Sequence, residues 1–442
     1  RGPAAHRAVS CSSSRAGPLT TSFYPTRHAG NLRVNLLRRH PVAIALVVLL
    51  LATAIHPLSP LVDAVTGSAP GDADLDRPIL YVFFAPLSNS LDALTFFSQP
   101  RAEWALAVWI LVLGAWGALR RSATPLRWRR RVARALVGPG VLILLGIAAV
   151  LLPRPVPRLT SDGVGTVIDY HAHTNLSHDG RPGWTLAKLA DWHERQGFEA
   201  SYVTDHNVVY NGSLPAPAGT SISLLPGVEW SVSGQHVVAI GPVEALPRDS
   251  FGGNTARMLR IFAAIERQGG LSIASLPEYW RNHWEDLGAF VVAGVDGFEI
   301  VNCAPKALGF PPDLRRQVLA LAGSHDLMVV GASDNHGWGQ VTCVWNVSRP
   351  GAQGFHTNRV FARPLALVQG NGWSWAAALS QPWYMLRSLS WSERASWLTW
   401  VVIVLLYRAM PRREGQGAGL GILARSLGRR RKAPAVPNET PT

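Results

Sequence analysis

The chain has 442 residues; 48% are hydrophobic, only 16% are charged, and 42 Lys and Arg against 28 Asp and Glu leave a formal net charge of +14. Soluble globular proteins carry about 25% charged residues, so this composition excludes a disordered chain and a simple soluble domain. Three cysteines in this length exclude a disulfide scaffold and a multi-cysteine zinc module.

The positive charge lies at the two ends of the chain. When Lys and Arg are counted against Asp and Glu, residues 1–158 carry +12, residues 159–394 carry −4 and residues 395–442 carry +6. A nucleic-acid-binding domain has its basic residues on its own folded surface. The mildly acidic middle therefore predicts that no nucleic acid is bound.

The first 157 residues predict a membrane region behind a short tail. Residues 1–33 are rich in Ser, Pro, Ala and Gly, and we expect them to be disordered. Residues 34–157 contain three apolar runs. Because a membrane-spanning helix needs about 20 apolar residues, each run predicts one such helix. These helices are expected near 41–62, 102–120 and 135–152.

The arginines beside these runs predict their orientation. Segment 31–40 holds three arginines and segment 120–134 holds seven, whereas the loop 63–103 between the first two runs is acidic. Loops that stay in the cytoplasm carry the excess of Lys and Arg. We therefore expect a multi-pass protein of the cell membrane, in contact with the lipid bilayer, whose chain lies outside the cytoplasm from about residue 155.

Residues 158–345 predict an α/β domain. Short apolar strands such as TVID and LMVVGA alternate with amphipathic helices such as LAKLADWHER. This alternation favours a (βα) barrel, in which active-site residues gather at the C-terminal ends of the strands.

Polar residues end several of these predicted strands. His171 and His173 follow the first strand, Asp334 and His336 follow the last, and Glu229 ends a strand between them. Residues two apart in a strand face the same side, so each pair can hold one ion. Imidazoles and carboxylates are ligands of Zn, Mn and Fe. The strand ends therefore predict a metal site.

The stretches DYHAHTNLSHDG, TDHN, PGVEW, HVVAIG and GASDNHG follow one another in this order. The series resembles the polymerase and histidinol phosphatase (PHP) superfamily over roughly residues 166–340 and looks like a membrane-anchored member of it. The resemblance implies a distorted (βα) barrel that hydrolyses phosphate esters with a water activated by two or three divalent ions (Mn, Zn or Fe).

The same resemblance implies roles for individual residues. The metal ligands that it implies are His171, His173, Asp179, His206, Glu229, His236, Asp334 and His336. Glu229, Asp334 and His336 are implied to be catalytic. Arg181 is the candidate for binding the substrate phosphate. The SHDG segment is one residue longer than the commoner SDG form, which leaves open whether His178 or Asp179 is the ligand.

One motif departs from the family. Where the family has His-Pro, this chain reads Leu276–Pro277, and a leucine cannot bind a metal. Ser275 and His283 are the alternative donors nearby. The leading hypothesis is a membrane-anchored metal-dependent phosphoesterase that acts on a phosphorylated small molecule or a cell-envelope substrate. The alternative is a catalytically impaired membrane sensor or scaffold that binds metal or a phosphorylated ligand.

The C-terminal part carries fewer signals. Residues 346–394 are rich in Trp and match no motif, and we expect an extension that completes the barrel or lies against the bilayer. Residues 395–411 predict a fourth transmembrane helix, and residues 412–442 a basic disordered tail. Cys303 and Cys343 fit either a disulfide or two free thiols.

Overall fold

A computed structural model describes residues 40–120, 128–162, 165–215, 217–232, 235–246, 255–283, 287–349, 354–370 and 372–410. The chain divides into two units, Arg1–Leu46 and Val47–Thr442, and the fold described below is that of the second. The segments 1–33 and 412–442, which we expect to be disordered, lie outside the described residues.

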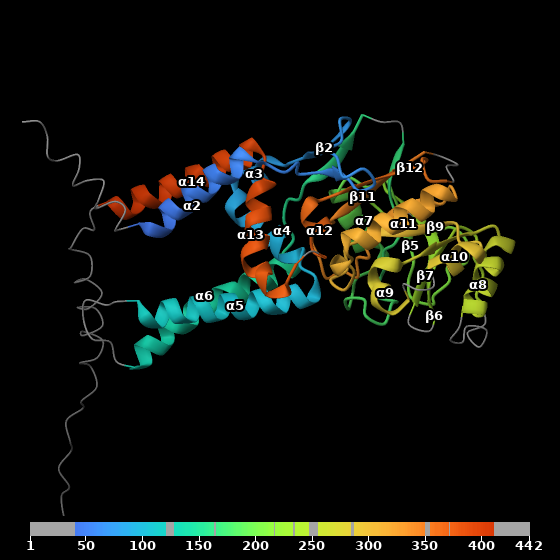
Figure 1. Ribbon diagram of the computed structural model, residues 1–442, viewed down its shortest axis with the longest axis horizontal. Helices are drawn as coiled ribbons and strands as arrows, with labels where there is room; N and C mark the ends of the chain where they lie inside the picture. Colours follow the sequence, from blue (N-terminus) through green and yellow to red (C-terminus); the bar gives the residue numbers. More distant parts are fainter. Residues whose placement is uncertain are drawn as a thin grey trace, which may run out of the picture. The chain divides into compact units, whose positions relative to one another are not determined.

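In the described part of the chain, five helices precede the α/β domain: α2 (Pro41–Ile55), α3 (Ile79–Phe83), α4 (Ala85–Thr95), α5 (Gln99–Leu119) and α6 (Trp128–Leu151). Among the described helices, α5 and α6 are the two long and apolar enough to cross a membrane, and little of either is buried in the protein. They run side by side (Figure 1), and a Cβ on Gly117 would collide with the backbone of Arg134. Small residues allow this close approach of two helices.

The first of the expected transmembrane helices, near 41–62, is not confirmed. Helix α2 has 15 residues and ends before Pro57. A proline disfavours the helical conformation of the residue before it, so the apolar run continues beyond residue 56 as non-helical chain.

The expected fourth transmembrane helix, 395–411, is not confirmed either. Its residues belong to α14 (Trp391–Ala409), which begins with a capping box between Ser390 and Glu393. Glu393 and Arg394 in the first turn are buried inside the protein. The start of this helix is therefore part of the protein core.

Ten strands form one sheet in the order β1-β12-β11-β4-β5-β6-β7-β8-β9-β10, and β2 pairs with β3 in a second sheet. The strands are β1 (Val62–Asp63), β2 (Ala73–Asp76), β3 (Arg158–Ser161), β4 (Thr166–Asp169), β5 (Ala200–Val203), β6 (Ser223–Val232), β7 (Gln235–Ile240), β8 (Leu271–Ala274), β9 (Gly297–Asn302), β10 (Met328–Ala332), β11 (Val344–Ser348) and β12 (Asn358–Ala362).

The mixed α/β architecture that we expected is present, but the strands are not all parallel. Strand β7 pairs antiparallel with both of its neighbours, β6 and β8. Only two residues separate β6 from β7, and parallel strands need a crossover of a dozen or more residues. The expected (βα) alternation is therefore interrupted at this hairpin.

The segments that follow β4 and β10 pair with each other. Ala172 forms a parallel bridge with Asn335. The amide of Asp334 donates to the carbonyl oxygen of His171 at 2.9 Å, and the amide of His173 donates to that of Asn335 at 3.1 Å. The strands from β4 to β10 thus curl until their two ends meet, which places the residues after β4 beside those after β10.

The side chain of Asn346 connects strands β4 and β10 themselves by hydrogen bonds. Its Nδ2 donates to the carbonyl oxygens of Ile168 on β4 and Gly331 on β10, at 3.0 and 2.8 Å, and its Oδ1 accepts from the amide of Gly331 at 2.7 Å. A Cβ on Gly331 would collide with Val344. Because Asn346 lies on β11, the sheet continues past residue 345, where we expected the α/β domain to end.

The remaining helices are α7 (Leu186–Arg195), α8 (Thr255–Arg267), α9 (Leu276–His283), α10 (Leu287–Val292), η3 (Ala307–Gly309), α11 (Pro312–Ser324), α12 (Pro364–Leu367), η4 (Ser374–Ala376) and α13 (Ala377–Arg387). Helices α7, α8 and α11 coincide with amphipathic stretches of the sequence, and Figure 1 shows them on the outside of the curled sheet.

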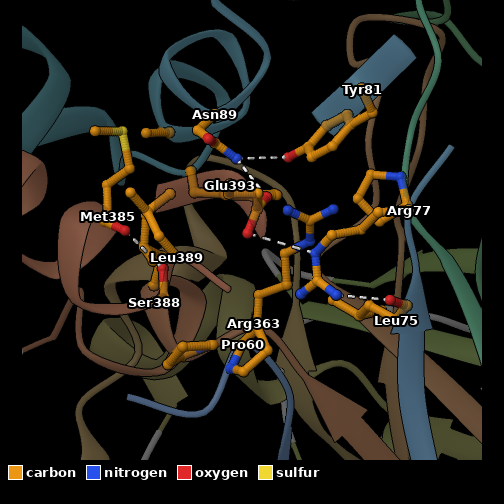
Figure 2. Close-up of a pocket in the computed structure, with 15 residues that line it drawn as sticks. Pro60, Leu75, Arg77, Tyr81, Asn89, Arg363, Met385, Ser388, Leu389 and Glu393 are labelled. Atoms are coloured by element: carbon orange, nitrogen blue, oxygen red, sulfur yellow. Dashed lines mark hydrogen bonds and ion pairs between the residues drawn. The ribbon is translucent and has the colours of Figure 1, made fainter. Parts of the chain in front are cut away.

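A buried polar junction joins the helices to the sheet. Asp92 on α4 accepts from Tyr81 at 2.8 Å, from Arg154 at 2.9 Å and from Arg363, which follows β12, at 3.1 Å. Figure 2 shows Asn89 donating to Glu393 of α14, at 2.7 Å. A cavity of about 40 Å³ beside these residues is too small for more than a water or two. We therefore interpret this junction as structural.

Candidate metal centre

Glu229 is the centre of a cluster of four imidazoles. Its Oε2 lies 2.9 Å from Nδ1 of His206, 3.2 Å from Nε2 of His171 and 3.3 Å from Nε2 of His173, and its Oε1 lies 2.5 Å from Nδ1 of His236. His171 and His173 follow β4, His206 follows β5 and His236 lies on β7, so the curled sheet brings together residues that are far apart in the sequence.

Asp334 and His336 join this cluster from the end of β10. Asp334 Oδ1 lies 3.2 Å from Nε2 of His173, 3.4 Å from Nδ1 of His336 and 3.6 Å from Nε2 of His171. Asp334 has a positive φ of 47°, a conformation that is costly for a non-glycine residue and that clusters at functional sites.

The hydrogen bonds of His171 and His173 determine which ring nitrogen is free. Nδ1 of His171 donates to Glu299 at 2.6 Å. Nδ1 of His173 lies 2.9 Å from Oγ of Ser177, and this hydroxyl gives its own proton to Asp205, so it accepts from His173. Each neutral imidazole then has its lone pair on Nε2, and these two atoms face each other at 2.8 Å. Two lone pairs at this distance repel, so either a proton or a metal ion is held there. Burial would lower the pKa of His171, but the charges of Glu229, Asp334 and Glu299 raise it, which favours the proton when no metal is bound.

Several buried polar atoms of the cluster lie at ion-pair distance from one another but make no hydrogen bond of standard geometry with any described residue. They are Nδ1 of His206, both carboxylate oxygens of Glu229, Nδ1 of His236, Oδ1 of Asp334 and Nε2 of His336. Buried polar groups are normally satisfied, and metal-binding imidazoles normally use their second nitrogen to bond a carboxylate or a carbonyl. Sets of three of these residues have donor atoms within 4.8 Å of one another. The donor set fits divalent ions such as Zn, Mn or Fe.

Asp179 is better placed than His178 to be a ligand. Its Oδ1 lies 3.1 Å from Nε2 of His336 and 3.5 Å from Nε2 of His206. His178 is highly exposed, and its Nδ1 lies 3.9 Å from the same oxygen of Asp179. The geometry therefore favours the carboxylate, and binding by either residue stays a prediction.

Glu278 is a donor that the sequence analysis missed. Leu276 is buried and lies with Phe290 beside a small apolar pocket. Two residues later on α9, Oε2 of Glu278 lies 3.0 Å from Nδ1 of His236. The other nitrogen of His236 is held by the hydroxyl of Tyr279 at 3.1 Å. A carboxylate thus stands beside Glu229 and His236, on the helix that begins with Leu276.

Neither of the alternative donors near Leu276 is shown to take this place. The hydroxyl of Ser275 donates to Glu299 at 2.5 Å, and the side chain of His283 lies outside the described part of the chain. Asn302 also donates to Glu299, at 3.1 Å. Glu299 therefore orients His171 from behind. A carboxylate in the otherwise apolar strand GFEIVN is the sequence signal that could have identified it.

Two acidic residues at strand ends have structural roles. Asp169 accepts from Nε2 of His193 at 2.8 Å, and Asp205 accepts from Thr174, Ser177 and Tyr210.

Arg181 donates to the carbonyl oxygen of Gly337 at 3.3 Å and lies over Trp338. A contact of Arg181 with a phosphate remains a prediction.

Close packing of opposite charges shifts the pKa values of the cluster. Burial would lower the pKa of His236, but the charges of Glu229 and Glu278 raise it to about 10. Burial would likewise lower the pKa of His206, but Asp179 and Glu229 raise it to about 9. Burial would raise the pKa of Glu229, and the surrounding imidazoles hold it well below its usual value. The cluster therefore binds protons when it holds no metal.

Cys303, which follows β9, and Cys343, which precedes β11, form a disulfide. It connects the segment after β9 to the segment that follows Asp334 and His336. Of the two alternatives for this pair, the structure shows the oxidised one.

No protein-family model and no curated protein matches the chain. Among solved structures, a protein described as a metal-dependent phosphoesterase from Bifidobacterium adolescentis is 17% identical over 43% of this chain and 92% of its own, with a TM-score of 0.30. PsfC from Pseudomonas syringae is 19% identical over 50% and 97%, with a TM-score of 0.31, and the lesion-specific endonuclease EndoQ from Pyrococcus furiosus is 12% identical over 47% and 57%, with a TM-score of 0.30. At these TM-scores the likenesses carry no argument about activity.

Proposed function

We propose that the protein is a membrane-anchored, metal-dependent phosphoesterase whose α/β domain lies outside the cytoplasm. The observation that carries this proposal is the convergence of His171, His173, His206 and His236 on Glu229, with Asp334 beside them. Such a set of donors has a known use in phosphate ester hydrolysis, where metal ions activate water and neutralise the charge on phosphate oxygens.

The residues of the chain divide among three adjoining positions. His171, His173, Glu229 and Asp334 would hold one ion. Glu229, His236 and Glu278 would hold a second, and Asp179, His206 and His336 a third. The distances from Asp334 to His173, from Glu278 to His236 and from Asp179 to His336 support these assignments.

The surrounding groups keep the donors in position. Glu299 holds the proton of Nδ1 of His171, and Asn302 donates to Oδ2 of Asp334 at 3.1 Å, which leaves Oδ1 turned to the cluster. Lys306 is exposed at the cavity beside the cluster, with its Nζ 3.6 Å from Glu278. Its ammonium group is available to a phosphate oxygen of the substrate.

Two observations support the proposed location. The exposed faces of α5 and α6 are apolar, and Arg129, Arg130 and Arg131 lie at the end of the hairpin away from the α/β domain. Basic residues favour the cytoplasmic side, which leaves the α/β domain on the other side. The disulfide between Cys303 and Cys343 is also typical of oxidising compartments.

The test uses the full chain in detergent, with Mn²⁺, Zn²⁺ or Fe²⁺ added to the chelated protein. We expect hydrolysis of p-nitrophenyl phosphate or its bis-ester and at least two bound ions per chain by mass spectrometry. Asp334→Ala should lower both, whereas Asp191→Ala, an exposed change on α7, should alter neither. Bound metal with no hydrolysis under any of the three ions would contradict the proposal.

The second candidate is a sensor or scaffold that binds metal or a phosphorylated ligand without hydrolysing it. Leu276 favours this alternative because it removes one imidazole from the second position. Tight binding of inorganic phosphate by the metal-loaded protein, without turnover of either ester, would support it.

A further inference from the structure

A cavity of about 660 Å³ lies between the metal centre and the membrane helices. One end is lined by polar residues of the cluster, among them Asp179, His206 and Asp334. The other end, formed by the helices, is lined by the apolar residues Leu94, Phe97, Ala102 of α5 and Val150 of α6, and by the polar Gln99 and Glu103 of α5. Such a volume is typical of sites for organic ligands, and it extends well beyond the metal ligands themselves.

The apolar end of the cavity is fixed to the loops that carry the metal ligands. The amide of Gln99, the first residue of α5, donates to the carbonyl oxygen of Pro305 at 2.9 Å. The side chain of Gln340, four residues after His336, donates to the carbonyl oxygen of Val150 at 2.9 Å. The ends of α5 and α6 are therefore walls of the same cavity as the cluster.

Exposed tryptophans lie around this end of the helices. Trp104 on α5 is 54% exposed, and Trp375 on η4, which packs against α5, is also 54% exposed. Tryptophan is enriched at the boundary between membrane and water. The apolar end of the cavity consequently lies at the level where a bilayer begins.

We propose that the substrate is a phosphate ester of a membrane lipid, with its phosphate at the metal centre and its apolar chain between α5, α6 and Phe97. This inference rests on the proposed function and names its substrate class. An apolar chain covers the partly exposed Leu94, Ala102 and Val150, whereas a small water-soluble ester leaves them in contact with water. The apolar chain of the lipid passes from the bilayer into the cavity without contact with water, because the ends of α5 and α6 form the cavity wall.

Binding of alkylphosphonates tests the inference separately from catalysis, since their carbon–phosphorus bond is not hydrolysed. The full chain in nanodiscs, loaded with Mn²⁺, is titrated with ethyl-, butyl-, hexyl- and octylphosphonate by calorimetry. We expect at least about 100-fold tighter binding of octyl- than of ethylphosphonate, because each methylene buried contributes a factor of about 4.

Ala102→Trp should reduce this gain to less than about 10-fold, because the new side chain fills the apolar end. The matched control is Ala115→Trp, an exposed position on the same helix outside the cavity, which should keep the full gain. If Ala102→Trp no longer binds Mn²⁺, which would indicate that this variant is misfolded, Val150→Trp serves as the second blocking variant.

Equal affinity for ethyl- and octylphosphonate would overturn the inference and point to a phosphate group recognised alone. A gain that survives in both blocking variants would also overturn it, because the chain would then lie elsewhere, for example in the nanodisc lipid. If the gain is found and blocked while no phosphate ester is hydrolysed, the proposed catalysis fails but the lipid-ligand inference stands.

Discussion

Oε2 of Glu278 lies 3.0 Å from Nδ1 of His236 and two residues after Leu276, which stands where a metal-binding histidine is expected. Helix α9 thus brings a carboxylate to the position that we propose for a second metal ion, where Leu276 offers no donor. Carboxylates are good ligands of Zn and Mn, so the position is not empty of donors.

The first prediction concerns this carboxylate. Glu278→Gln should remove one bound ion per chain, or weaken its binding by at least about 10-fold, because the amide is a poorer ligand than a carboxylate. Calorimetric titration of the chelated protein with Mn²⁺ measures this. Glu266→Gln, on the exposed face of α8, is the matched control. Unchanged stoichiometry and affinity in Glu278→Gln would show that Glu278 is not a ligand.

The second prediction concerns Glu299 as a positioning residue. Glu299→Gln should weaken metal binding by about 10- to 100-fold, because the neutral amide makes His171 a less basic ligand. The loss of metal affinity should depend on pH, because in this variant no negative charge holds the proton on Nδ1 of His171. Glu244→Gln, at an exposed position, should leave binding unchanged. A uniform loss of folding instead of this pH-dependent change would indicate a merely structural role.

The third prediction concerns the melting temperature, which should fall with rising pH in the metal-free protein, whereas the increase caused by added metal should grow. In the chelated protein the pKa values of His206 and His236 are raised from about 6.5 to about 9 and about 10. Their contribution to stability is complete below about pH 6.5 and is lost as the pH rises through those values. The melting temperature of the chelated protein should therefore fall from pH 6.5 to 10.

Metal requires deprotonated imidazoles, so the increase of the melting temperature on adding Mn²⁺ should grow over the same pH range. Replacing both histidines by Gln should flatten both trends. A chelated protein whose melting temperature does not change between pH 6.5 and 10 would refute the coupling.

The fourth prediction concerns the junction between the helices and the sheet. Asp92→Asn leaves Arg154 and Arg363 buried without their counter-charge, and breaking a buried ion pair costs about 3 to 5 kcal/mol. Thermal unfolding of the full chain in detergent should show a large drop in melting temperature. Asp191→Asn removes an exposed pair with Arg195 and should cost less than about 0.5 kcal/mol. Similar effects of the two changes would disprove the structural role of Asp92.

The fifth prediction concerns the disulfide between Cys303 and Cys343. In protein isolated from cells after rapid alkylation, both cysteines should be found oxidised, since the domain is proposed to lie outside the cytoplasm. Replacing both by Ser should lower the free energy of unfolding by about 4 kcal/mol in the chain-entropy model for a loop of this length. Alkylated thiols at both positions in the isolated protein would argue for a cytoplasmic domain.

The sequence by itself determined the kinds of elements and the chemistry of the centre. Strand and helix patterns are local, so the stretches that became β4, α7, α8, α11 and β10 are recognisable without the fold. Likewise His171, His173, Glu229 and Asp334 predict a metal site because imidazoles and carboxylates are the usual ligands of divalent ions. It also located the two apolar runs that are α5 and α6.

Only the tertiary structure decided which groups meet. The pairing of the segments after β4 and β10, the carboxylate of Glu278 beside His236, and Glu299 behind His171 depend on contacts between residues more than 40 positions apart. The cavity between α5, α6 and the metal centre likewise exists only when the helix ends dock on the loops. Such contacts are set by strand register and packing across the whole chain, which no local pattern encodes.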